Sequence, residues 1–273
     1  MKKLFKGTLF IVVILFTAWC VFAFFIKPSN DRDWVADNAI LPHSVTNGDM
    51  MTIYNVRNNT YRSPIDFVPG YYDKTYNLAE LNSVDFIVAP FNPPTAHTFV
   101  SFGFEDGSHV AISIEARREV GESYSVLKGM LRQFEMMYVV ADEADVLKLR
   151  TNHRADGNVY LYPIKISQVK ARALFVDMMN KANKLYQNPK FYNSITNNCT
   201  NALVQHVNNI AEKEAQIGFS WKYVLPAYSD KLAYDQGLIN DTGEFKDLKL
   251  KYLITPKAKT CGDASDFSAC IRQ

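Results

Sequence analysis

The sequence lacks the short motifs that mark the commonest cofactor and metal sites. It contains no Gly-rich phosphate-binding loop and no G-x-S-x-G nucleophile elbow. It also has no C-x-x-C, H-x-H or H-E-x-x-H pair, and its five histidines are scattered. We therefore expect no cofactor and no metal, so that any catalysis would come from the chain's own side chains.

The sequence also lacks an excess of charge of one sign, and it lacks internal repeats. The 273 residues carry a net charge of only +2, which argues against a nucleic-acid partner because such proteins carry a concentrated basic surface. No repeat or low-complexity tract is visible, which excludes solenoids and disordered scaffolds. The apolar fraction of 48% is enough for one sizeable core.

Cysteine is scarce, and its four positions differ in kind. Cys20 falls in an apolar run near the N-terminus. Cys261 and Cys270 stand nine residues apart in a polar tail and form a natural disulfide pair in an oxidising compartment. Cys199 is then left over, and an unpaired cysteine outside the cytoplasm is a candidate reactive thiol.

The only long hydrophobic run lies at the N-terminus. Three lysines precede 19 uncharged residues, 8–26, which at about 1.5 Å per residue span a bilayer core of roughly 30 Å. The run ends in "FAFFIKP" without the small residues of a cleavage site, which favours an uncleaved transmembrane helix over a signal peptide. The lysines place residues 1–7 in the cytoplasm. We expect a single-pass inner-membrane protein with a linker, 27–50, and an extracytoplasmic domain, 51–273.

Strand patterns precede helical patterns along the domain. "VDFIVAPF" is typical of a buried strand. In "HTFVSFGFEDGSHVAISIEAR" alternating side chains on both sides of the "EDGS" turn predict a β-hairpin. Further strands are expected in "MMYVVADE" and "VYLYPIKIS", whereas "FVPGYYDKTYN" is expected to be irregular. Helices are predicted by apolar spacing from Ser167 to Asn188-Pro189, from Cys199 to Ile210, and over 229–238. This order predicts an α+β fold.

Cys199 stands in the first turn of the second predicted helix, behind "TNN". Asn197 or Asn198 is a good N-cap, and the positive end of the helix dipole stabilises a thiolate nucleophile. A buried structural thiol is the competing interpretation, because free cysteine is among the most buried residue types. The helix-start position and the extracytoplasmic location favour the nucleophile.

A cysteine nucleophile needs a base, usually a histidine. His206 shares the apolar stripe of the same helix but lies about 10.5 Å further along its axis, and we expect it in the core or a groove. His43 and His153 lie in polar, loop-like sequence. His97 opens a strand directly after the rigid "NPPTA" and is the best candidate base.

Hairpin geometry selects Glu115 as the partner of this histidine. Around the "EDGS" turn, positions summing to about 213 face each other, so His97 lies opposite Glu115 or Ala116. A carboxylate there can orient the imidazole, as the acid does in a catalytic triad. His109 would lie near the turn, roughly 23 Å along the strand from His97. The competing role for Glu115 is an ion pair with one of the two arginines that follow it.

Several stretches together resemble one family. They are "WVADNAILP", "YNVRNNTYRS", "AHTFVSFGF", "AISIEARRE", "RQFEMMYVVADEADVLKLRT", "VYLYPI" and "FYNSITNNCTNAL". From about Trp34 to His206 the chain resembles the periplasmic domain of the Lnb-type lipoprotein N-acyltransferases. The order His, acid, Cys is also similar to that of the permuted papain-like fold, which NlpC-type peptidases and lecithin:retinol acyltransferase share.

This resemblance implies a permuted papain-like (NlpC-like) domain with an antiparallel sheet, and thiol acyl transfer. Cys199 would take an acyl chain from a phospholipid as a thioester, and His97 would deprotonate the thiol and then the amine of a lipoprotein acceptor. Glu115 of "SIEARRE" would be the third member. Two alternatives stay open: a cysteine amidase or peptidase acting on cell-wall peptides, and a non-catalytic envelope scaffold.

Overall fold

The computed structural model describes residues 7, 8, 10, 13, 14, 17, 19, 25–154, 157–262, 264 and 266–273. Most of the expected transmembrane helix, 8–26, including Cys20, lies outside these residues. No helix among the described residues is long and apolar enough to cross a membrane.

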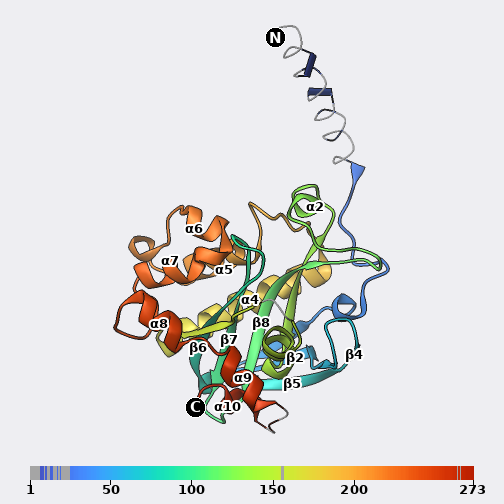
Figure 1. The fold of residues 1–273 in the computed structure, drawn as a ribbon. Coiled ribbons are helices and arrows are strands. Elements are labelled where there is room, and N and C mark those ends of the chain that lie inside the picture. Colours follow the sequence, from blue (N-terminus) through green and yellow to red (C-terminus); the bar gives the residue numbers. More distant parts are fainter. Residues whose placement is uncertain are drawn as a thin grey trace.

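A mostly antiparallel eight-stranded sheet forms the centre of the fold (Figure 1). Its order is β1-β2-β9-β8-β7-β6-β10, with β5 also paired to β2, and β3 and β4 form a separate two-stranded sheet. The strands are β1 (His43–Asn47), β2 (Met50–Arg57), β3 (Thr60–Tyr61), β4 (Phe67–Val68), β5 (Tyr71–Asn77), β6 (Leu81–Pro90), β7 (Ala96–Phe104), β8 (His109–Arg117), β9 (Glu135–Ala141) and β10 (Tyr160–Pro163). The single parallel contact, between β2 and β9, makes the sheet mixed rather than purely antiparallel as expected.

Helices cover both faces of this sheet, so the α+β class is confirmed. They are α2 (Val126–Met130), α3 (Glu143–Lys148), α4 (Gln168–Gln187), α5 (Cys199–Ile210), α6 (Trp221–Val224), α7 (Ser229–Asp235), α8 (Phe245–Lys251), α9 (Thr255–Cys261) and α10 (Phe267–Cys270). Short turns add η1 (Ala36–Asn38), η2 (Leu78–Glu80), the π-helical η3 (Leu149–His153), η4 (Lys213–Ala215) and η5 (Pro226–Tyr228). Ser167 caps α4 as predicted, since its hydroxyl accepts from the amide of Lys170.

Strand alternation divides the core into layers on the two faces. Val100, Phe102 and Ile112 pack with α4 and α5 on one face. Phe99 and Ala111 pack with α3, α9 and α10 on the other. A third cluster joins β6 and β10 to α7 and α8. The helix of Cys199 and the helices of the C-terminal tail therefore lie on opposite sides of the sheet.

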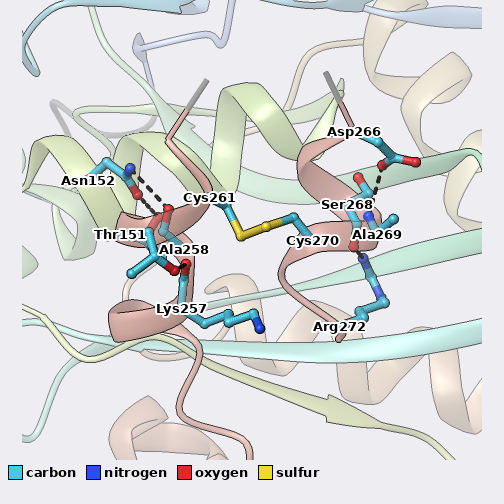
Figure 2. The surroundings of a disulfide bond; sticks show 11 residues. Thr151, Asn152, Lys257, Ala258, Cys261, Asp266, Ser268, Ala269, Cys270 and Arg272 are labelled. Carbon is cyan, nitrogen blue, oxygen red and sulfur yellow. Dashed lines mark hydrogen bonds between the residues drawn. A yellow bond between two sulfur atoms is a disulfide. The ribbon is translucent and has the colours of Figure 1, made fainter. Parts of the chain in front are cut away.

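A disulfide joins Cys261 and Cys270, the pair that the sequence suggests, with an S–S distance of 2.06 Å (Figure 2). It ties α9 to α10. The side chain of Asn152 in η3 donates to the carbonyl of Ala258 in α9 at 3.2 Å. The tail thus supports η3, which reaches the site described below.

Two segments are more ordered than the sequence indicates. Residues 27–50, expected as a linker, contain η1 and β1, and β1 pairs along its whole length with β2. The stretch 67–77, expected to be irregular, contains β4 and β5. That expectation was wrong because Pro69 and Gly70 form only a short link between these strands, and β5 is a polar strand held by its pairing to β2.

Candidate active site

The candidate site lies where β7 and β8 separate. The two strands pair only from Phe99 and Ser113 to Gly103 and His109. Beyond Phe99, β7 stays paired with β6 as far as Ala96, and β8 stays paired with β9 to its end. A cavity of about 350 Å³ opens in the resulting wedge.

The wedge brings together side chains from the two faces of the sheet. Cys199 belongs to the core layer of α5, whereas His97 shares its strand face with Phe99. In an unbroken ladder the strand backbones would separate them. Here Cys199, His97 and Glu115 all line the one cavity, with the aromatic rings of Phe91, Tyr124 and Tyr192.

Cys199 is the first residue of α5 and is only 4% exposed. Asn198 is the N-cap, with its side chain accepting from the amide of Asn201 at 2.9 Å. The thiol lies 3.9 Å from the carbonyl oxygen of Ala96, the residue before His97. Among the described residues it makes no hydrogen bond to the imidazole, and such bonds are commonly long until substrate binds.

A hydrogen-bonded chain leads from His97 to Arg150. His97 Nε2 lies 2.6 Å from Ser113 Oγ, Ser113 Oγ donates to Glu115 Oε1 at 2.8 Å, and Arg150 donates to the same oxygen at 3.1 Å. The direct distance between His97 Nε2 and Glu115 Oε1 is 3.6 Å, which is too long for a hydrogen bond. Glu115 therefore reaches the imidazole through Ser113.

This chain sets the tautomer of the imidazole. An ionised carboxylate only accepts hydrogen bonds, so the single hydroxyl proton of Ser113 is used on Glu115. Ser113 Oγ can then only accept from His97, which places the ring proton on Nε2. The lone pair is left on Nδ1, the nitrogen available to take a proton.

The charge states of His97 and Glu115 agree with this tautomer. Burial and then the nearby cation of Arg150 lower the pKa of His97 to about 3, although Glu115 opposes them. Burial alone would raise the pKa of Glu115, but Arg150, His97 and Arg57 together hold it well below its usual value. At neutral pH the imidazole is uncharged and the carboxylate is ionised.

The other histidines lie away from the cavity. His206 is buried as expected and bridges Tyr138 of β9, at 2.5 Å, to Asp177 of α4, at 2.6 Å. It fastens α5, which carries Cys199, to the sheet and to α4. His43 stacks on two tyrosines, His109 lies at the turn of the hairpin, and His153 ends η3.

Three residues of the site were not found from the sequence. Ser113 is an ordinary inward-facing strand serine, and Arg150 belongs to a helical turn far along the chain. Tyr192 lies beside Cys199: burial raises the pKa of its hydroxyl well above the usual value, and the neighbouring Cys199 and Tyr124 raise it further. No group of three or more His, Cys, Asp and Glu able to hold a metal occurs within the described part of the chain.

One comparison with known proteins gives a match. The family model of the Lnb N-terminal periplasmic domain matches residues 68–227, more than half of the chain. This range contains Cys199, His97 and Glu115. No curated protein and no solved structure matches the chain.

Proposed function

The chain belongs to the Lnb N-terminal periplasmic domain family, and on that premise we propose that it is a membrane-anchored, thiol-dependent acyltransferase facing the periplasm. It takes an acyl chain from a phospholipid onto Cys199 as a thioester and passes the chain to the α-amine of a lipoprotein. The observation that carries the proposal is the shared cavity of a helix-start thiol and a neutral imidazole whose lone pair is on Nδ1.

Each step can be assigned to residues that line the cavity, with Ser113 linking two of them. His97 Nδ1 removes the thiol proton, and the thiolate of Cys199 attacks the ester carbonyl carbon. The tetrahedral intermediate collapses, the C–O bond breaks, and the departing lysophospholipid alcohol takes the proton from the imidazolium. The acceptor amine then attacks the thioester carbonyl carbon and loses a proton to His97, the C–S bond breaks, and the thiolate of Cys199 takes the proton back from the imidazolium. Glu115 stabilises the transient imidazolium through Ser113.

The fold favours the same family of mechanisms. We propose a permuted papain-like arrangement, because the chain order is His97, Glu115, Cys199 and the helix of the thiol packs directly on the strand of the base. The hydroxyls of Thr98 in β7 and Thr200 in α5 meet at 2.9 Å and join these two elements.

Exposed apolar side chains near the cavity support a lipid donor. Around α2 they are Val120, Tyr124, Val126, Leu127, Met130 and Leu131, and around α6 they are Phe219, Trp221, Leu225 and Tyr228. Figure 1 shows both helices at the end of the domain where the N-terminal segment enters, and Ile26 and Pro28 share a cavity with Arg132 and Phe191 just beyond α2. This end would face the bilayer, with aromatic rings suited to its interface.

The test is the intact mass of the full chain after incubation with phospholipid vesicles, beside Cys199→Ala. We expect a hydroxylamine-labile fatty-acyl adduct on the wild type alone, and an unchanged circular dichroism spectrum for the variant. An adduct that persists in Cys199→Ala would contradict the proposal. The absence of any adduct, together with Cys199-dependent cleavage of cell-wall peptides, would establish the amidase alternative instead.

A further inference from the structure

Four arginines line the cavity of Cys199, which is many for a space of about 350 Å³. Three of them pair with carboxylates: Arg57 with Asp145 at 2.8 Å, Arg118 with Asp37 at 3.2 Å, and Arg150 with Glu115 at 3.1 Å. The guanidinium of the fourth, Arg154, forms no hydrogen bond or ion pair with any residue in the described ranges. Among the described residues, these four arginines thus have three partner carboxylates, and the guanidinium of Arg154 has none.

The surroundings of Arg154 carry an excess of positive charge. Desolvation of the guanidinium, then the cation of Arg150, lower the pKa of Arg154 to about 10, and the cation of Arg118 adds to this, whereas Glu115 and Tyr61 oppose it. The guanidinium stays charged at neutral pH. An anion placed beside it would relieve the repulsion among the three arginines.

Arg154 is also well placed relative to the reacting groups. A second cavity of about 240 Å³ shares His97, Arg150, Arg154 and the turn residues Phe91 and Asn92 with the first. The backbone amide of Arg154 donates to the carbonyl of Leu149 at 3.0 Å, and this hydrogen bond holds the main chain of Arg154 at the end of η3. A ligand held at Cys199 and extending past His97 would meet this guanidinium.

We propose that Arg154, assisted by Arg118, forms an anion subsite that takes the phosphodiester group of the acyl donor while the ester carbonyl lies at Cys199. The planar fork of a guanidinium matches two oxygens of a phosphate group. This inference rests on the proposed function, because in a phospholipid the phosphodiester is attached to the same glycerol as the reacting ester. A neutral diacylglycerol with the same acyl chains lacks the group.

The subsite positions the donor rather than taking part in bond making. Removing it should therefore raise KM for phospholipid more than it lowers the rate of thioester formation at saturation. A charge-assisted bidentate contact is among the stronger hydrogen-bonded pairs, and we expect at least a tenfold loss in kcat/KM, which corresponds to about 1.4 kcal/mol.

The experiment compares Arg154→Gln, Arg154→Lys and the control Arg62→Gln in the full chain. Arg62 is an exposed arginine paired with Asp66 outside the cavity. The first readout is the single-turnover rate of thioester formation from phosphatidylglycerol and from diacylglycerol with matched chains in the same micelles. The wild type and Arg62→Gln should prefer the phospholipid about tenfold, Arg154→Gln should show no preference, and Arg154→Lys should recover part of it.

The second readout needs no acyl transfer. Glycerol 3-phosphate should slow alkylation of Cys199 by iodoacetamide in the wild type and in Arg62→Gln, but not in Arg154→Gln. Equal preference ratios in wild type and Arg154→Gln, or protection that survives the substitution, would overturn the subsite. Stronger protection by a peptide carboxylate than by glycerol 3-phosphate would also overturn it. If no donor acylates the wild type, the proposed function fails, whereas the protection assay still decides the subsite.

Discussion

Replacing Ser113 by alanine tests the relay between His97 and Glu115 most directly. The substitution removes one oxygen that accepts from His97 at 2.6 Å and donates to Glu115 at 2.8 Å. The remaining distance of 3.6 Å between Nε2 and the carboxylate is too long to replace those bonds. The imidazole then loses the contact that keeps its proton on Nε2.

The expected magnitude follows from the charge of the acceptor. A hydrogen bond to a charged group contributes about 1.5–3 kcal/mol, and each 1.36 kcal/mol corresponds to a tenfold change in rate. If the relay is fully used when the imidazolium forms, Ser113→Ala lowers the rate of thioester formation about 10- to 100-fold. Glu115 keeps its contact with Arg150, so the effect should be smaller than that of His97→Ala.

The assay is single-turnover thioester formation at pH 7, with the ¹⁵N resonances of His97 as a second readout. Ser101→Ala is the matched control, because Ser101 is an equally buried serine on the same face of the neighbouring strand and lies away from the cavity. We expect Ser113→Ala alone to show a mixture of imidazole tautomers. A wild-type rate, or an unchanged Nε2–H tautomer, would refute the relay.

Three further predictions concern stability. The pKa of His97 is lowered in the folded chain, so between about pH 6.5 and pH 3 the unfolded chain binds a proton that the folded chain does not. The free energy of unfolding should therefore fall as the pH decreases through this range. Urea titrations should show a shallower fall for His97→Gln than for the wild type. Reduction of the Cys261–Cys270 disulfide, or Cys261→Ser, should lower the free energy of unfolding by about 2–3 kcal/mol from loop entropy, measured with and without dithiothreitol. Arg272→Met leaves the fully buried Glu143 and a second carboxylate without their cation, and should lower Tm by an amount equivalent to about 3–5 kcal/mol; an unchanged Tm would contradict this ion pair's role.

The register of the hairpin was predictable from sequence because alternation and a tight turn fix it locally. The observed pairs sum to 212, within one of the expected value. The N-cap of α5 was predictable for the same reason, since Asn198 acts on an amide only three residues away. Both features depend on neighbours in the chain.

The point at which β7 and β8 separate could not be predicted in this way. It depends on β6 and β9 keeping their partners, so it is a property of the whole sheet. Arg150 reaches Glu115 from a π-helical turn 35 residues further along the chain, and no local sequence pattern predicts that contact. Ser113 becomes informative only once its two partners are known.

The separation of the strands explains how one site can draw on separate core layers. The thiol is held by α5, which His206 fastens to β9 and α4. The cation that fixes Glu115 is held by η3, which packs on α9 through Asn152. Because the disulfide joins α9 to α10 on the face opposite α5, the tail supports Glu115 and His97 while α4 and α5 support Cys199. The width of the wedge, and with it the distance from thiol to imidazole, is therefore set jointly by both helical layers.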